Sequence, residues 1–348
     1  MPEVTEQPPS TESRKVDHVK INLEENVQFP NMTTGLEHYR FLHRAVPEVN
    51  LAAIDTSVSL FGKILDSPLL ISSMTGGAKL AVTLNQRLAR AAQKYNIAMG
   101  VGSQRAALED DELAYTFQIR DYAPDIMLFA NVGAVQLNYG YGVDEMQRAV
   151  DMLQATALIL HFNVLQEAVQ PEGDTNFAGL LDKIEAICSA SSVPVIAKEV
   201  GWGFSPQDVK DLVNVGISAI DVAGAGGTSW SEVEYHRAPN AYYARVARAF
   251  ADWGIPTSDA ILYAKEAAPE TPIIASGGLR DGIDVAKCIA LGALVGGMAG
   301  PFLKAANDSQ EAVEQFIEET NAQIKIAMLC SGATTIEDLQ NTALIKVD

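Results

Sequence analysis

Cysteine and basic residues are scarce in this chain of 348 residues. The three cysteines, Cys188, Cys288 and Cys330, lie far apart in helical patterns, which matches neither a disulfide framework nor a metal-binding spacing. Lysine and arginine number 25 against 44 aspartates and glutamates, giving a net charge of −19. Because nucleic acids and anionic membranes attract basic surfaces, this balance predicts neither as a partner. No apolar run reaches the ~18 residues of a transmembrane helix, and no signal-peptide core is evident, so we expect a cytoplasmic protein.

Short apolar runs alternate with helix-length amphipathic segments from residue 68 onward. Eight runs are typical of buried parallel strands: 68–73, 97–101, 126–131, 157–161, 194–198, 219–222, 272–276 and 293–298. Helical patterns cover 84–95, 144–153, 177–189, 206–215, 258–268, 281–291 and 311–329. Strict alternation requires parallel crossovers, so eight units predict an α/β fold of the (β/α)8 TIM barrel type. An open doubly wound sheet is the alternative.

The first 67 residues do not show this alternation of strands and helices. Residues 1–13 are polar and contain three prolines, which predicts a disordered N-terminal tail. Residues 14–67 form an irregular N-terminal extension, and we expect 14–348 to form a single domain. About fifty residues separate the sixth and seventh predicted strands. An insertion of that length is expected over the barrel mouth or at a subunit contact.

A polar stretch directly follows the fourth predicted strand. Residues 161–171, HFNVLQEAVQP, bring His161, Asn163, Gln166 and Glu167 close together in the sequence. Barrel enzymes carry their active sites at the C-terminal ends of the strands, where loops tolerate polar groups. The other seven predicted strands also end in small, polar or charged residues, which favours an active site there. An ordinary strand-to-helix loop would account for any one of these residues alone.

The loops after the last two predicted strands carry glycines suited to a phosphate group. Gly277 and Gly278 allow close backbone approach, Arg280 offers positive charge, and Ala299-Gly300 lie on the neighbouring loop. Barrels often bind phosphate at these loops. The alternative is that the glycines only form tight turns.

Lys198 ends an otherwise apolar strand, so we expect its side chain to point into the barrel mouth. Charged side chains are seldom buried without a partner, and an anionic cofactor would supply one. The alternative is a structural ion pair with Glu199 or Glu167. The segment 224–230, GAGGTSW, lacks the lysine of a P-loop and the spacing of a dinucleotide fingerprint.

Taken together, these motifs resemble the type 2 isopentenyl diphosphate isomerases, FMN-dependent enzymes of isoprenoid biosynthesis. The resemblance covers nearly the whole chain after residue 13. It rests on RKVDH (14–18), TTGLEHYRFLHRAVPE (33–48), SPLLISSMTGG (67–77), GVGSQRAAL (100–108), FANVGAVQL (129–137), LHFNVLQEAVQPEGD (160–174), KEVGWG (198–203), DVAGAGGTSWSEVE (221–234), DWGIPT (252–257), ASGGLRDG (275–282) and MAGPFL (298–303).

The resemblance implies a role for each matching residue. FMN contacts would come from Ser73, Met74, Thr75, Ser103, Asn131, Lys198 and Thr228. The FMN phosphate would bind at Gly277, Gly278, Leu279, Arg280, Ala299 and Gly300. The substrate would meet Arg14, Lys15, His18, Ser103, Gln104, Arg105, Asn163 and Gln166. Glu167 would hold Mg²⁺, and the residues expected to act in catalysis are Gln166, Lys198 and His18.

The reaction implied by the resemblance converts isopentenyl diphosphate to dimethylallyl diphosphate through loss of one proton and gain of another. It requires reduced FMN, with NAD(P)H as the usual reductant, and places the flavin N5 region at the reacting carbons. A small-molecule substrate, Mg²⁺ and a homo-oligomer of four or eight copies complete the expectation.

Three other functions fit parts of the sequence. A 2-hydroxy-acid oxidase or dehydrogenase needs a histidine base and an arginine, for which His236 and Arg237 are the candidates. A nucleotide dehydrogenase needs a catalytic cysteine, and none of the three cysteines lies in a mouth loop. A non-catalytic FMN carrier is the third alternative.

Overall fold

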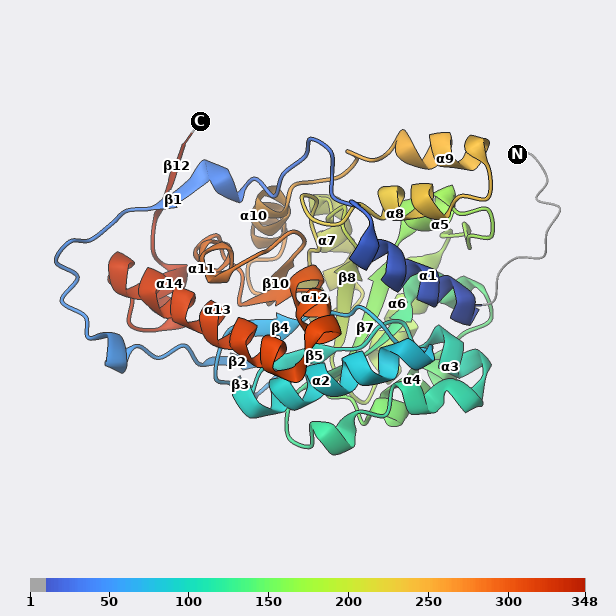
Figure 1. Ribbon diagram of the computed structural model, residues 1–348, viewed down its shortest axis with the longest axis horizontal. Coiled ribbons are helices and arrows are strands. Elements are labelled where there is room, and N and C mark those ends of the chain that lie inside the picture. Colours follow the sequence, from blue (N-terminus) through green and yellow to red (C-terminus); the bar gives the residue numbers. More distant parts are fainter. Residues whose placement is uncertain (1–10, 348) are drawn as a thin grey trace.

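The core of the computed structural model, which describes residues 11–347, is a closed barrel of eight parallel strands (Figure 1). The barrel strands are β4 (Leu69–Ile71), β5 (Ala98–Gly100), β6 (Leu128–Gly133), β7 (Ala157–Phe162), β8 (Val195–Glu199), β9 (Ala219–Asp221), β10 (Ile273–Ser276) and β11 (Val295–Met298). Each strand pairs with the next one in the chain, and β11 closes the ring against β4. The eight predicted strands are confirmed, and the open sheet is excluded.

The barrel strands are apolar because both of their faces are covered. Every residue of the eight strands is buried except His161 and Phe162, at the C-terminal end of β7. Parallel strands with helices outside and packed side chains inside require such continuous apolar runs. The change to partial exposure at His161 marks the level at which the barrel opens.

Three polar residues lie side by side at this level. The strand register pairs His161 of β7 with Lys198 of β8, and Lys198 with Asp221 of β9. Residues paired across neighbouring strands share a face of the sheet, because side chains alternate along each strand. The register therefore brings a histidine, a lysine and an aspartate together at the C-terminal end of the barrel.

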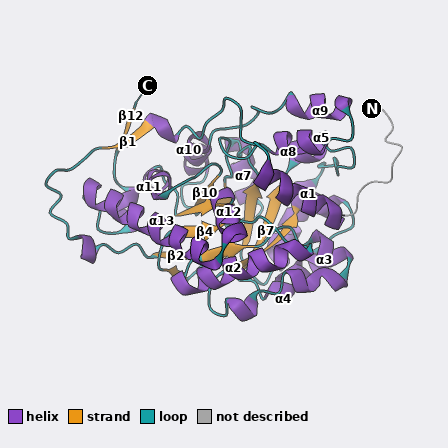
Figure 2. Ribbon diagram, in the orientation of Figure 1, coloured by secondary structure: helices purple, strands orange, loops and turns teal. Residues whose placement is uncertain are grey.

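Helices surround the barrel (Figure 2). The outer helices are α2 (Lys79–Tyr95), α4 (Val143–Leu153), α6 (Leu180–Ala190), α7 (Pro206–Asn214), α10 (Thr257–Ala267), α11 (Gly282–Ala290), α12 (Gly300–Asp308) and α13 (Gln310–Ser331). All seven predicted helices are present, with shifted ends. For example, α6 starts at Leu180 because Gly179 before it adopts a left-handed φ of 64°.

Shorter elements complete the loops. They are the α-helices α3 (Arg105–Glu109), α5 (Val164–Val169), α8 (Trp230–Arg237), α9 (Ala241–Arg248) and α14 (Ile336–Gln340), and the 3-10 helices η1 (Leu36–His38), η2 (Leu51–Ala53), η3 (Asp111–Thr116), η4 (Arg120–Tyr122) and η5 (Ala134–Asn138). Helices α8 and α9 form the predicted insertion between β9 and β10. Helix α8 packs against α5 and α1, so the insertion lies over the polar end of the barrel.

The N-terminal extension is more regular than predicted. A helix, α1 (Thr11–Glu24), crosses the barrel mouth beside α8 and α12 (Figure 1). Further along, β2 (Val58–Leu60) and β3 (Lys63–Leu65) form a hairpin, and β1 (Tyr39–Phe41) pairs with β12 (Leu344–Lys346). Residues 1–10 and 348 lie outside the described residues, and with them most of the tail predicted for residues 1–13.

The cysteines lie in α6, α11 and α13, as their helical patterns predicted, and all three are free thiols. Burial raises the pKa of the Cys188 thiol to about 11 and that of Cys288 well above its usual value. Within residues 11–347, no helix is both long and apolar enough to cross a bilayer.

Candidate active site

A cavity of ≈ 840 Å³ opens at the C-terminal end of the barrel, beneath α1 and the β9–β10 insertion. The sequence analysis predicted an active site at this end of the barrel. All but one of the predicted site residues line it: Arg14, Lys15, His18, Ser73, Met74, Thr75, Ser103, Arg105, Asn131, Asn163, Gln166, Glu167, Lys198, Thr228, Gly277, Gly278, Leu279, Arg280, Ala299 and Gly300.

Gln104 is the exception and corrects the sequence analysis. Its side chain is fully buried, donates from Nε2 to the Ala149 carbonyl of α4 at 2.9 Å, and accepts at Oε1 from the Asn131 N–H at 2.9 Å. The amide is thus turned outward and occupied by the backbone. Gln104 fixes the end of β6, and its side chain does not line the cavity.

Lys198 lies in the row of polar residues at the barrel opening. Its Nζ donates to the Glu199 carbonyl at 2.9 Å and lies 3.5 Å from Asp221 Oδ2. The ion-pair partner is therefore Asp221, and neither Glu199 nor Glu167 as the alternative interpretation held. The Glu199 carboxylate points elsewhere and accepts the backbone N–H groups of residues 200–203. Burial raises the pKa of Glu199 to about 7, against the effect of these hydrogen bonds.

His161 is held as a neutral ring beside Lys198. Burial, reinforced by the charges of Lys198 and Lys15, lowers its pKa to about 4. Asn131 donates from Nδ2 to the Val101 carbonyl at 3.0 Å, which leaves its Oδ1 facing His161 Nδ1 at 2.8 Å. The assigned orientation of Asn131 therefore puts the proton on Nδ1 and leaves Nε2 as an acceptor.

The end of β7 and the start of α5 carry the cluster that the sequence singled out. Asn163 Nδ2 donates to Glu167 Oε1 at 2.8 Å, and the Asp174 N–H donates to Glu167 Oε2 at 2.7 Å. Burial nevertheless raises the pKa of Glu167, so a cation in the cavity would stabilise its charged form.

The chemistry of this carboxylate fits Mg²⁺ bound largely through other ligands. Within residues 11–347, no group of three or more histidine, cysteine, aspartate or glutamate side chains is arranged to hold a metal ion. The nearby Asp174 carboxylate is already bonded to Arg105 and Gln136. Mg²⁺ commonly binds one or two carboxylates and takes its other ligands from water and substrate phosphates. Glu167 suits that arrangement.

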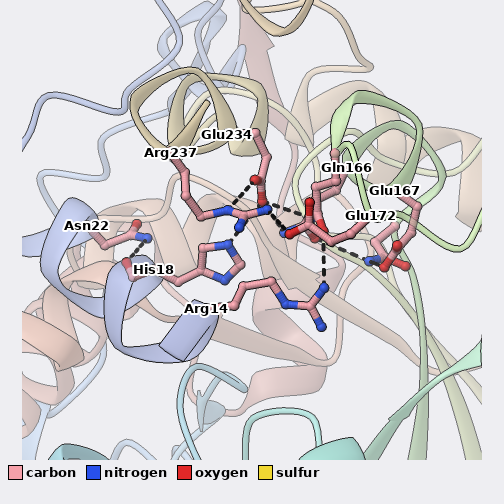
Figure 3. A network of polar contacts seen from close by, with 10 residues as sticks. Arg14, His18, Asn22, Gln166, Glu167, Glu172, Glu234 and Arg237 are labelled. Carbon is pink, nitrogen blue, oxygen red and sulfur yellow. Dashed lines mark hydrogen bonds and ion pairs between the residues drawn. The ribbon is translucent and has the colours of Figure 1, made fainter. Parts of the chain in front are cut away.

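Glu234 of α8 joins the elements above the cavity, and sequence reasoning did not single it out (Figure 3). Its Oε1 accepts from Gln166 at 3.0 Å and Gln170 at 2.9 Å and lies 3.0 Å from His18 Nε2, while Oε2 accepts from Arg237. Although burial opposes ionisation, His18 and Arg237 lower the pKa of Glu234 to about 2. The sequence signals for Glu234 were its position in the insertion and at the end of the matching motif 221–234.

Basic side chains surround the outer part of the cavity. Arg14 Nη1 donates to Gln170 Oε1 at 3.4 Å, and Lys15 Nζ donates to the Ser103 carbonyl at 2.6 Å. Burial, aided by the Arg14 charge, lowers the pKa of Lys15 to about 7. Arg105 joins them from α3 and bonds Glu109 and Asp174. Three cations from two elements thus converge in a chain of net charge −19.

The opposite side of the cavity fits a flavin phosphate. Gly277 and Gly278 adopt φ angles of 102° and 75°, and a Cβ on Gly227 would lie 2.5 Å from the Gly278 nitrogen. The loops after β9 and β10 therefore approach as closely as glycine allows. A Cβ on Gly300, at the start of α12, would meet nothing within 4 Å, which leaves room at a helix N-terminus.

The hydroxyls of Ser72 and Ser73 support the same assignment. Both oxygens are buried, and neither has a hydrogen-bond partner among the described residues. Buried polar atoms normally find a partner. Both serines line the cavity, so a polar ligand there would supply one.

The pair proposed for a hydroxy-acid oxidase does not form a base site. Arg237 is bonded to Glu234 and Glu172, and His236 lies 3.9 Å from Glu25. Neither residue lines the cavity.

Comparisons with known proteins agree with this geometry. Residues 10–117 and 144–346 match the family described as FMN-dependent dehydrogenase. The isopentenyl-diphosphate delta-isomerase of Nostoc sp. is 55% identical over 345 residues, covering 99% of each chain. The chain belongs to the isopentenyl-diphosphate delta-isomerase family. The member of this family from Synechococcus sp. is 52% identical, over 97% of each chain, and that from Rickettsia bellii is 50% identical, over 95% of this chain and 96% of the relative.

Solved structures of two oxidases share the fold of this isomerase family member. A lactate oxidase from Pediococcus acidilactici superposes with a TM-score of 0.67 at 18% identity, over 95% of this chain and 87% of its own. A mandelate oxidase with bound (S)-2-phenylpropionate gives 0.68 at 18% identity, over 97% and 98%. At this identity the likeness concerns the barrel and not the reaction.

Proposed function

We propose that this chain isomerises isopentenyl diphosphate to dimethylallyl diphosphate, in isoprenoid biosynthesis, with reduced FMN and Mg²⁺. The observation that carries the proposal is one cavity with two chemically different sides. Glycine loops and unpartnered serine hydroxyls form one side, and Arg14, Lys15, Arg105 and Glu167 lie on the other. The names of relatives at 50–55% identity support the same reaction.

The diphosphate would bind among the cations of α1 and α3. Arginine forks suit phosphate oxygens, and Arg14 and Arg105 present two of them. Lys15, whose pKa is about 7 in the free protein, would be held in its charged form by the incoming anion. Glu167 would contribute the carboxylate of a Mg²⁺ site completed by the diphosphate.

The hydrocarbon end of the substrate would lie against Asn163 and Gln166. Gln166 is held in place because its Nε2 donates to Glu234 and its Oε1 accepts from Asn163 at 3.3 Å. Such a fixed amide can orient an alkene, whereas an amide alone is a poor general acid. His18 lies 3.0 Å from the same Glu234 oxygen and would act beside Gln166 at this end of the substrate.

The flavin would be held by Ser73, Met74, Thr75, Asn131 and Thr228, with its phosphate at the glycine loops and Ala299-Gly300. Reduced FMN supplies the acid–base centre for the proton exchange. Lys198 would stabilise negative charge on the reduced ring, which is the electrostatic contribution of the protein. We further propose NAD(P)H as reductant, and a homo-oligomer of four or eight copies in the cytoplasm.

Multiple turnovers without a nicotinamide test the reaction. Enzyme reduced with dithionite under anaerobic conditions, with Mg²⁺ and isopentenyl diphosphate, should give many product molecules per flavin. In D₂O, deuterium should enter dimethylallyl diphosphate, since the added proton comes from an exchangeable group. A single turnover, or equal activity with oxidised flavin, would contradict the proposal.

Two control assays separate the alternatives. Lactate and mandelate should not reduce the bound flavin, because the His236–Arg237 pair lies outside the cavity. Heat-released chromophore should be FMN by chromatography, since the site offers one phosphate cradle and no dinucleotide fingerprint. FAD, or turnover of the hydroxy acids, would point to a redox enzyme.

A further inference from the structure

Asp221 is a buried carboxylate beside Lys198, which lines the cavity, and the proposed reaction gives it no role. It ends β9 and is 0% exposed. Its Oδ1 accepts a hydrogen bond from Ser276 of β10, which anchors one side of the group. Its Oδ2 accepts no hydrogen bond from any described residue and lies 3.5 Å from Lys198 Nζ. One oxygen is therefore fixed by the barrel, and the other lies beside the ammonium. The Ala223 backbone N–H also helps to lower the pKa of this carboxyl.

The surroundings of Lys198 leave Asp221 as its only ion-pair partner among the described residues. His161, its neighbour on β7, is neutral because its pKa is about 4. Glu199 contacts the ammonium through its backbone carbonyl, while its carboxylate is directed at the N–H groups of residues 200–203. How much positive charge Lys198 presents to the cavity therefore depends on Asp221.

We propose that Asp221 is a positioning residue that draws the Lys198 ammonium toward β9 and thereby sets the reduction potential of the bound flavin. The inference rests on the proposed function in that it takes FMN as the cofactor. A buried positive charge favours the reduced, anionic ring, and a neighbouring carboxylate weakens that effect by displacing and compensating the charge. Asp221 thus limits how strongly Lys198 stabilises the reduced state.

The two residues act as a unit. Burial raises the pKa of Asp221, and the Lys198 charge is the chief influence that opposes this. Removing the ammonium would therefore leave a buried carboxyl that takes up a proton and becomes neutral. A neutral Asp221 would no longer affect the flavin electrostatically. Its effect on the reduction potential therefore requires Lys198.

Asp221→Asn keeps the shape of the side chain and removes its charge. The bound flavin should then be reduced more easily, with an equilibrium constant for reduction at least tenfold higher. For a two-electron couple this corresponds to a potential about 30 mV more positive. Lys198→Gln should shift the potential in the opposite direction. In the double variant, Asp221→Asn should add no further change, which a double-mutant cycle measures.

The experiment is an anaerobic redox titration of the flavin-loaded wild type and the three variants against a dye of known potential. A potential unchanged in Asp221→Asn would overturn the proposal, and so would a rise that persists fully in the Lys198→Gln background. Ser276→Ala removes a hydrogen bond that helps to keep Asp221 charged, so it tests the same idea if Asp221→Asn does not fold. It should raise the potential by a smaller amount, and no rise would contradict the proposal.

A matched control and the flavin content separate this inference from the proposed function. Asp182→Asn replaces an exposed aspartate of α6 and should leave the potential unchanged. Failure of the wild type to bind FMN would defeat the proposed function itself. Binding of FMN with the same potential in wild type and Asp221→Asn would defeat only the role of Asp221.

Discussion

Among single side chains, Glu167 and Lys15 both line the cavity and have charges that a ligand there could change. Both are buried to an extent that disfavours their charged forms, as the directions of their pKa shifts indicate. A cation beside Glu167 and an anion beside Lys15 would each reverse that effect. The two residues therefore suit a ligand that brings Mg²⁺ and a diphosphate together.

Glu167→Gln should impair the use of Mg²⁺ and leave flavin binding intact. The carboxylate lies at the start of α5, whereas the glycine loops follow β9 and β10. Loss of a main metal ligand should lower activity by roughly 10²-fold, or about 2.7 kcal/mol of barrier. Activity measured against Mg²⁺ concentration checks this, with Glu185→Gln on the exposed face of α6 as control. Unchanged Mg²⁺ dependence would remove Glu167 from the metal site.

Lys15 should make substrate capture depend on pH. Its pKa in the free protein is about 7, so the charged form that attracts a diphosphate is present below pH 7 and is lost above it. We expect kcat/KM to fall above pH 7, approaching tenfold per pH unit. Lys15→Met should lower kcat/KM at pH 6 and flatten this part of the profile. A wild-type profile that stays level up to pH 9 would contradict the assignment.

Among the secondary structure elements, α1 contributes more to the site than to the core. It provides Arg14, Lys15 and His18 to the cavity, whereas Val19 is its one buried hydrophobic residue among side chains 14–24. Its contacts are with α8 and α12, which are themselves at the mouth. Its share of the main hydrophobic core is limited to Val19, with Leu23 packed against it.

A chain beginning at Glu25 should therefore remain folded and bind flavin while losing substrate affinity. We expect kcat/KM to fall by more than 10²-fold, because three substrate-side groups are lost, and the thermal midpoint to change by only a few degrees. Flavin content and circular dichroism check the fold. Lys20→Ala on the exposed side of α1 is the control and should keep full activity. Loss of flavin from the shortened chain would show that α1 supports the barrel.

The strands could be predicted and α1 could not, for a physical reason. Strands such as β4 and β8 are buried on both faces, so each appears in the sequence as an uninterrupted apolar run. Helix α1 is mostly polar, and its apolar face consists only of Val16, Val19 and Leu23. The helix packs against α8 and α12, which lie far away in the sequence, so these contacts cannot be recognised from the local sequence of α1.

At the scale of the whole molecule, topology could be predicted, whereas contacts between distant segments could not. Eight alternating units were enough for the barrel and for the end that carries the site. The bond between His18 and Glu234 joins residues 216 positions apart, and nothing in either local sequence indicates it. For Gln104 the local sequence was misleading. It lies in a motif that matches the family, yet its side chain turns outward and bonds the backbone of α4.

The pairing of β1 with β12 has a consequence for the order in which the chain folds. The two strands lie about 300 residues apart, and at typical rates of protein synthesis roughly 15 to 60 s separate their emergence from the ribosome. During that time Tyr39–Phe41 have no strand partner. Strand β4 can pair with β5 early, but its other edge stays unpaired until β11 closes the barrel. The nascent protein therefore carries two unpaired strand edges through most of its synthesis, and both are covered only when the last part of the chain arrives.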